Sequence, residues 1–273
     1  MSHTFHPDVS VNSALVSHMT TQWGQFLDHD ISRTPTEETE DCCLTPQAEN
    51  CFPIVIPIND SFYSRLSSPQ RCHKFSRSIA FCQELSPVRE QMNAITAFID
   101  ASSVYGSDSE MSALLRSGVE GKLRVNSNVS AFDREMLPEV DGVLTAGDVR
   151  ARDMPGLAAM HTLFLREHNR LANQIKGRSP ETLKDEEIFQ LARRILIAEV
   201  QNIVYSEYLP VVLGETTMRK YDLNLPDGNG YTTYRNDVDP GIVNVFATAA
   251  YRFYIFVCCF CQLIYFIIGL VTQ

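Results

Sequence analysis

The sequence lacks an excess of basic residues: its 273 residues include 23 Lys and Arg against 33 Asp and Glu, a formal net charge of −10 at pH 7. Binding to a phosphate backbone needs a positively charged face, so this balance argues against a nucleic-acid partner. Internal repeats and low-complexity tracts are also lacking, which excludes a repeat architecture. Hydrophobic residues make up 44% of the chain, an ordinary fraction that suffices for one large domain or two small ones.

The N-terminal stretch MSHTFHPDVSVNSALV lacks the charged segment and the apolar run of a signal peptide. Two N-x-[ST] sequons, at Asn59 and Asn128, nevertheless agree with a secreted protein. The cysteine pattern described next also fits an oxidising compartment. A secreted setting without an export signal predicts that the native N-terminus lies upstream of this chain.

Zinc-site spacing is absent from the cysteines. Five of the eight lie in a stretch rich in Pro, Asn and Ser, which predicts a disulfide framework: Cys42, Cys43, Cys51, Cys72 and Cys82. Our hypothesis is that Cys42 or Cys43 pairs with Cys51 and that the other pairs with Cys72. Cys82 is then either free or bonded to another chain.

Few alternating strand patterns are present, so the periodicity predicts a mainly α fold with little β structure. Helices are expected over about 9–31, from Ser86-Pro87 into Asp100, and over 107–118, 154–177 and 184–214. Ser107 and Asp185 are the expected N-caps, and Gly118 and Gly177 the expected C-terminal glycines. Residues of about 33–86 are expected to form an irregular excursion held by disulfides.

The stretch WGQFLDHDIS, Trp23–Ser32, concentrates polar residues beside the chain's only tryptophan. On a helix, Gln25, Asp28 and His29 share one face because positions i, i+3 and i+4 are neighbours. Asp30 points about 100° further round the helix and must serve another purpose. A lone histidine beside carboxylates is usually structural, so this cluster alone does not establish a catalytic site.

The segment QWGQFLDHD resembles the distal-histidine motif of the animal haem peroxidase family. Three further segments are similar to family blocks and occur in the family order: NAITAFIDASSVYGSD, TAGDVRARDMPGLAAMHTLFLREHNRLA and NVFATAAYRF. The resemblance covers residues of about 7 to 253. It implies a helical domain that holds haem b, oxidation of a halide or phenolic donor by H2O2, and a secreted or cell-surface location.

The resemblance also assigns roles on the distal side of the haem. His29 would be the base that moves a proton between the two oxygens of H2O2. Gln25 would hydrogen-bond to water or halide. Arg150 matches the distal arginine, a permanent cation that stabilises charge on the departing oxygen. Arg152 is the nearby alternative, and Arg150 is preferred because it lies three residues before the acidic Asp153.

Other matched positions concern attachment of the haem. Asp28 and Asp153 match two carboxylates that can form ester bonds to haem methyl groups. The second position is usually Glu in the family, and Asp is one methylene shorter. Met154 matches a methionine that can bond to a haem vinyl group, although gap-filling in the core is the favoured interpretation. Arg252 matches an arginine near the proximal side.

A calcium site is implied beside the distal histidine. Asp30 matches a calcium ligand, and the run TAFIDAS supplies the others: Thr96, the Phe98 carbonyl, Asp100 and Ser102. Ca²⁺ takes six to eight hard oxygen ligands, which these residues offer in part. Such a site would fix the orientation of the helix that carries His29.

His161 and His168 lie seven residues apart in MHTLFLREHNRLA, and therefore on roughly one helix face. That spacing allows metal ligation. The favoured interpretation is structural, with both residues supporting the wall of the haem pocket.

The resemblance ends after Phe253. The family places its proximal haem ligand, a histidine, where this chain has Ile255. Residues 253–271, FYIFVCCFCQLIYFIIGLV, carry no charge and are long enough for one membrane span. The tail 254–273 is interpreted as a gene-model artefact, which is preferred, or else as a membrane anchor or a buried helix.

The chain is therefore expected to hold a partial peroxidase domain over 1–253, cut before the proximal histidine. A membrane partner is expected only if the apolar segment is genuine. The alternative function is a non-catalytic, calcium-binding interaction module, either secreted or tethered to a membrane, on the peroxidase scaffold.

Overall fold

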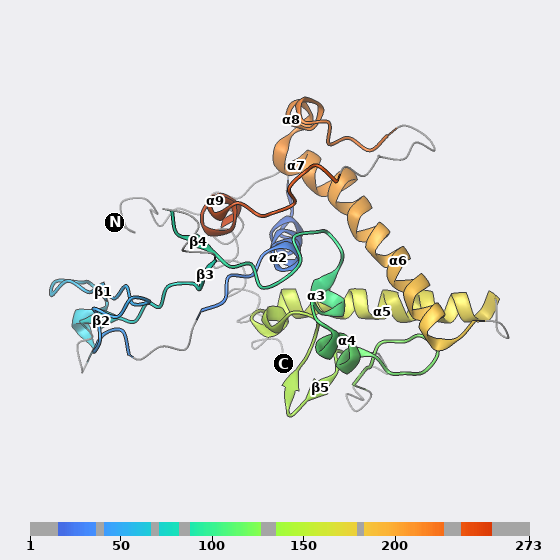
Figure 1. The fold of residues 1–273 in the computed structure, drawn as a ribbon, viewed down its shortest axis with the longest axis horizontal. Helices are drawn as coiled ribbons and strands as arrows, with labels where there is room; N and C mark the ends of the chain where they lie inside the picture. The colour runs from blue at the N-terminus through green and yellow to red at the C-terminus, as the bar shows by residue number, and fades with distance from the viewer. Residues whose placement is uncertain are drawn as a thin grey trace.

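The computed structural model describes residues 16–36, 41–66, 71–81, 88–126, 135–178, 183–226 and 236–252. Helices dominate this part of the chain, as predicted (Figure 1). They are α2 (Met19–Ile31), α3 (Ser102–Tyr105), α4 (Ser109–Leu115), α5 (Pro155–Arg178), α6 (Asp185–Ile203), α7 (Leu209–Leu213), α8 (Glu215–Lys220) and α9 (Asn244–Thr248).

The described strands form three antiparallel pairs of two residues each. They are β1 (Ile54–Val55) with β2 (Cys72–His73), β3 (Ala80–Phe81) with β4 (Glu90–Gln91), and β5 (Glu139–Val140) with β6 (Val143–Leu144). The last pair turns through Asp141 and Gly142, both at positive φ, which is the Asp-Gly chemistry of a two-residue hairpin.

The core lies where α5 meets α2 and α6 (Figure 1). Leu157, Phe164 and Leu165 of α5 are buried at the spacing of one helix face. Phe26 of α2 stacks on Phe164, with ring centroids 5.0 Å apart. The burial of these aromatic rings fixes α2 against α5 and so positions the polar residues that follow Phe26.

Both ends of α5 and the start of α6 agree with the prediction to within one residue, but the predicted N-caps of α6 and α4 are wrong. α5 starts at Pro155 and ends at Arg178, one residue past the predicted Gly177. α6 starts at Asp185, but its N-cap is Lys184, whose backbone N–H donates to Glu187 at 2.7 Å. Asp185 is therefore a first-turn acid that suits the helix dipole, and not the cap.

The cap prediction for α4 was also wrong. Asp108, and not Ser107, caps the helix, because its carboxylate accepts from the Met111 N–H. The helix ends at Leu115, before Gly118, because Arg116 is extended and pairs with Leu123.

The helix expected from Ser86-Pro87 into Asp100 is not formed in its described part, which starts at Val88. The backbone N–H groups bond outward instead: Met92 donates to the Ile79 carbonyl and Ala94 to the Arg33 carbonyl. The Asn93 side chain donates to the Ile31 carbonyl and accepts from the Arg33 N–H. This segment therefore closes the end of α2 and leaves no backbone groups for a helical ladder.

The helix expected over 9–31 is shorter at its start. α2 begins at Met19, residues 16–18 lie outside it, and residues 9–15 lie outside the described part. Its end at Ile31 agrees with the prediction.

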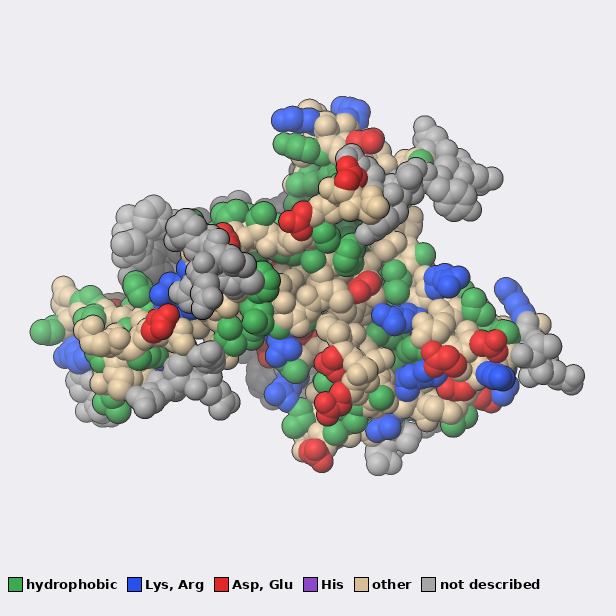
Figure 2. Space-filling view, viewed as in Figure 1, with side chains coloured by type: hydrophobic (Ala, Val, Ile, Leu, Met, Phe, Trp, Pro, Cys, Tyr) green, Lys and Arg blue, Asp and Glu red, His purple; other side chains and the backbone are tan. Residues whose placement is uncertain are grey.

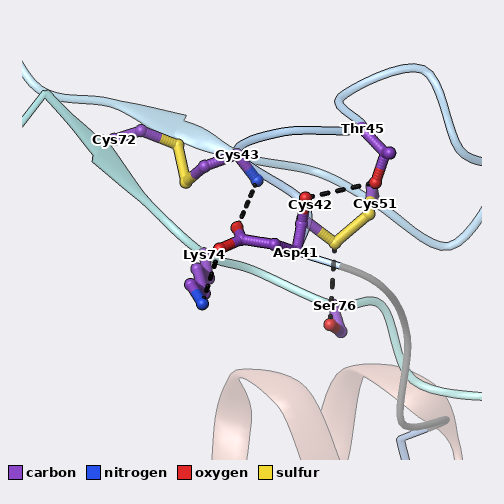
Figure 3. The surroundings of a disulfide bond; sticks show 8 residues. All are labelled: Asp41, Cys42, Cys43, Thr45, Cys51, Cys72, Lys74 and Ser76. Carbon is purple, nitrogen blue, oxygen red and sulfur yellow. Dashed lines mark hydrogen bonds and ion pairs between the residues drawn. A yellow bond between two sulfur atoms is a disulfide. The ribbon is translucent and has the colours of Figure 1, made fainter.

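The cysteine-rich excursion extends from the helical body as an arm (Figure 1). Two disulfides hold it, Cys42–Cys51 and Cys43–Cys72, with Cα–Cα distances of 5.2 and 6.0 Å (Figure 3). This is one of the two predicted pairings. Beside them, Asp41 binds Lys74 at 2.6 Å and accepts from the Cys43 N–H. Exposed apolar side chains follow the arm (Figure 2), and Cys82 lies outside the described residues.

The apolar segment 253–271 and Ile255 also lie outside the described residues. Of the helices that are described, none combines the length and the apolar character needed to cross a bilayer.

Candidate functional site

α2 carries a run of buried polar side chains. Asp28, His29 and Asp30 are 1%, 5% and 0% exposed, whereas Gln25 is half-buried. Three consecutive polar residues buried in one helix require polar partners on more than one side, because unpaired buried groups are costly. Each of the three faces a different neighbour.

Arg150 lies beside His29, although 121 positions separate them. A 3₁₀ turn (Val149–Arg152) leads into α5 and presents the Arg150 side chain to the end of α2. Its Nη2 donates to the carbonyl oxygen of Ser32 at 3.0 Å and to that of His29 at 3.5 Å. Arg152, the other candidate, is exposed.

Asp148 fixes the Arg150 side chain. The guanidinium donates to both carboxylate oxygens of Asp148, at 2.8 and 2.7 Å, and Asp148 is 3% exposed. Burial alone would raise the pKa of Asp148, but hydrogen bonds and charge from Arg150, with a contribution from His29, hold it below its usual value. The sequence analysis missed Asp148; its position two residues before Arg150 is the signal that could have identified it.

The remaining haem-linked candidates occupy different surroundings. Asp28 accepts a hydrogen bond from Ser32 Oγ at 3.0 Å, and its charge acts on Tyr208, whose hydroxyl accepts from that of Tyr251 at 3.0 Å. Asp153 is exposed. Met154 packs against the hydrophobic core, which is consistent with gap-filling.

Arg252 is the last residue of a 3₁₀ turn (Ala250–Arg252), and its side chain lies outside the described part of the structure. No contact of the predicted proximal-side arginine is therefore defined.

A second cluster brings Asp30 together with the start of α3. Its carboxylate accepts from the backbone N–H groups of Ala101 and Ser103, both at 3.1 Å, and from Ser102 Oγ at 3.2 Å. Ala101 has a left-handed backbone with φ +56 and is fully buried. A non-glycine residue is strained in this conformation, and its bond to Asp30 helps to maintain it.

The other predicted calcium ligands meet at the same place. Thr96 Oγ1 donates to Asp100 at 3.0 Å and to Ser102 Oγ at 3.3 Å. The Phe98 carbonyl accepts from the Asp100 N–H at 3.0 Å. All five residues therefore contribute oxygen atoms to one small region.

The charges in this cluster suit a cation. Burial, together with the nearby Asp100 carboxylate, raises the pKa of Asp30 to about 6 against opposing hydrogen bonds from Ser103, Ala101 and Ser102. A bound cation favours the ionised form of a carboxylate whose pKa is raised in this way. The donors are all oxygens, the type that Ca²⁺ prefers.

His168 belongs to the core. Its Nδ1 bonds to the Tyr105 hydroxyl and its Nε2 to the Gly121 carbonyl, both at 2.8 Å. Burial lowers its pKa to about 4, so it is a neutral hydrogen-bonding residue as favoured from the sequence. His161 is also buried, and its pKa is lowered to about 4, mainly by desolvation.

The donor set around α2 fits the distal side of a haem. It combines an imidazole, an amide, a buried carboxylate and a guanidinium held by Asp148. Among the described residues the other histidines are engaged elsewhere or buried in the core: His18 bonds to Gln22, His73 to Tyr63, and His168 as above. An axial ligand for iron is therefore not found in the described part of the chain.

Comparisons with known proteins find similarity to peroxidases over most of the chain. The animal haem peroxidase family model matches residues 1–259, which extends into the predicted tail. Myeloperoxidase from Mus musculus is 41% identical over 260 residues, covering 85% of this chain and 34% of that protein. Eosinophil peroxidase from Homo sapiens is 39% identical over 258 residues, with the same coverage. Peroxidase A from Dictyostelium discoideum superimposes with a TM-score of 0.72 at 27% identity, over 90% of this chain and 48% of that one. The chain spans about a third of the length of these curated relatives.

Proposed function

Since the chain belongs to the animal haem peroxidase family, we propose that it carries the distal half of a haem site for the oxidation of halide or phenolic donors by H2O2. The observation that carries this proposal is the placement of Arg150 beside His29, fixed by Asp148. Haem b is the implied cofactor. When bound, it supplies the iron that reduces peroxide and stores the oxidising equivalents.

The protein residues would perform the proton and charge chemistry. His29 would take a proton from one oxygen of H2O2 and return it to the other, which departs as water. Arg150 stabilises the negative charge that develops on the departing oxygen, and Asp148 keeps its guanidinium in place. Gln25, half-buried one turn before His29, orients peroxide or halide by hydrogen bonding.

Other residues would hold the haem. Asp28 is the better candidate for an ester bond, because it is buried on the same helix as His29. Asp153, Met154 and Arg252 remain proposals as further haem contacts. A partial peroxidase domain over 1–253 and a tail over 254–273 are likewise proposals.

Calcium would be bound by Asp30, Thr96, Phe98, Asp100 and Ser102. Of these, Asp30 directly follows the distal histidine. A cation there would tie the end of α2 to α3 and so fix the direction of His29. The disulfides support an extracellular or cell-surface location.

The proposal is tested by adding haem to the purified chain and measuring oxidation of a phenolic donor with H2O2. A Soret band and turnover are expected, and His29→Leu should abolish turnover while haem binding persists. Arg152→Leu serves as the control and should retain turnover. Equal turnover in the wild type and His29→Leu would exclude His29 as the base.

A second candidate function is a non-catalytic, calcium-binding interaction module. It is favoured by one observation. The five oxygen donors of the calcium candidate come together within the described residues, whereas no axial haem ligand is found among those residues. Calcium-dependent thermal stability without haem uptake would select this function over the first.

A further inference from the structure

The His161 ring on α5 is 1% exposed, and neither ring nitrogen makes a hydrogen bond of normal geometry with any residue that the structure describes. The Ser103 carbonyl lies near enough to raise the pKa of His161 slightly, but it does not satisfy the ring. A neutral imidazole carries one donor and one acceptor. Leaving both groups without a hydrogen bond in the core costs free energy, so a hydrogen-bonding partner for this ring would stabilise the fold.

A small, partly open pocket borders the same ring. Its walls are mostly apolar, including Val104 of α3 and Leu165 of α5. The polar side chains of its lining are the buried His161, the half-buried Thr145 and the exposed Arg124. Its volume of about 10 Å³ is room for roughly one water.

We propose that this pocket is a binding site for one ordered water molecule, held by a ring nitrogen of His161 and by the Thr145 hydroxyl. Thr145 Oγ1 donates its own proton to the Val143 carbonyl at 2.8 Å, so its lone pairs can accept from the water. The water donates its second proton to the unprotonated ring nitrogen. Two polar partners are the fewest that typically hold an ordered water inside a protein.

The bound water fixes the His161 ring at a junction of the fold. The ring lies edge-on to Phe26, with centroids 5.2 Å apart, one turn before His29 on α2. The charges of Asp148 and Arg150 both act on it. An oriented, neutral His161 therefore supports α2 and the turn that carries Arg150 from behind, and this role does not require haem.

His168 offers a matched comparison on the same helix. It is equally buried, but its nitrogens are satisfied by Tyr105 and Gly121. His168→Phe therefore leaves two protein groups without a partner. His161→Phe removes the polar group together with its water and leaves no protein hydrogen bond broken.

The test counts long-lived internal waters by oxygen-17 magnetic relaxation dispersion in the whole chain and in both variants. We expect one fewer in His161→Phe than in the wild type, no loss in His168→Phe, and the larger drop in melting temperature for His168→Phe. An unchanged water count in His161→Phe overturns the proposal.

Thr145→Val provides a nearly isosteric second variant if His161→Phe does not fold. It should shorten the residence time of the same water or remove it. A crystal structure of the wild type should show a solvent peak within hydrogen-bond distance of both His161 and Thr145, and a dry pocket would contradict the proposal.

Discussion

At the residue scale, the candidate distal site depends on how the protein holds the side chain of Arg150, a residue type that is usually exposed. Arg150 is half-buried and would otherwise move among many rotamers. Asp148 restricts it with a bidentate ion pair, and the carbonyl oxygens of His29 and Ser32, at the end of α2, accept from its Nη2. The position of its charge relative to His29 is therefore set before any ligand arrives.

Asp148→Asn should lower the rate at which the haem-loaded protein reacts with H2O2 by roughly 10²-fold, because a misplaced catalytic group costs about that much. Stopped-flow absorbance measures this rate. Asp141→Asn is the control, since Asp141 is exposed in the β5–β6 turn and Asn tolerates its positive φ. A rate for Asp148→Asn equal to that of the control would remove Asp148 from the account.

The buried histidines predict a loss of stability at moderately acidic pH. His161 and His168 are neutral in the fold because burial lowers their pKa from 6.5 to about 4. The unfolded chain binds their protons from about pH 6.5 downward, so the stability that they contribute is present above pH 6.5 and is lost as pH falls toward 4. Urea denaturation at pH 7 and pH 5 should show a lower midpoint at pH 5, and His161→Phe should reduce the difference. Equal midpoints would contradict this.

At the scale of single elements, the sequence predicted the helices that are stabilised by residues close together in the chain. The apolar spacing of α5 and its first-turn proline gave both ends within one residue. Residues 88–100 have a helical-looking composition, yet the N–H groups of Met92 and Ala94 bond to the carbonyls of Ile79 and Arg33, which are distant in sequence. Asp148 lies two residues before Arg150, but only the folded chain shows that this ion pair reaches the end of α2.

The arm gives a prediction at this scale. The Cys43–Cys72 disulfide spans 29 positions and Cys42–Cys51 spans nine. In the chain-entropy model the larger loop stabilises more, so Cys43→Ser/Cys72→Ser should cost about 1 kcal/mol more than Cys42→Ser/Cys51→Ser. Thermal denaturation of the two variants measures the difference, and the reverse order would contradict the model for this arm.

At the scale of the whole molecule, α2 lies between two polar clusters, one on each of two sides of the helix. His29 and Asp28 serve the proposed haem side, and Asp30 serves the oxygen cluster at α3. The aromatic contacts of α2 with α5 hold the helix between them. Binding of a ligand at either cluster should therefore change the affinity of the other cluster for its ligand, because both depend on the orientation of α2.

Calcium at 100 times its dissociation constant should raise the free energy of unfolding by about 2.7 kcal/mol. The expected change is an upward shift in melting temperature on addition of Ca²⁺ that is absent in Asp30→Asn. Glu139→Gln, at an exposed residue of β5, is the control and should keep the shift. A melting temperature independent of Ca²⁺ in the wild type would exclude the site.

The central claim is that Arg150, and not Arg152, completes a distal peroxidase site with His29. The most direct test is the second-order rate constant for reaction of the haem-loaded chain with H2O2 in Arg150→Leu and Arg152→Leu. We predict a loss of roughly 10²–10³-fold for Arg150→Leu, as for removal of a preorganised charge-stabilising donor, and no change for Arg152→Leu. Equal rate constants in the two variants, or a loss confined to Arg152→Leu, would contradict the account.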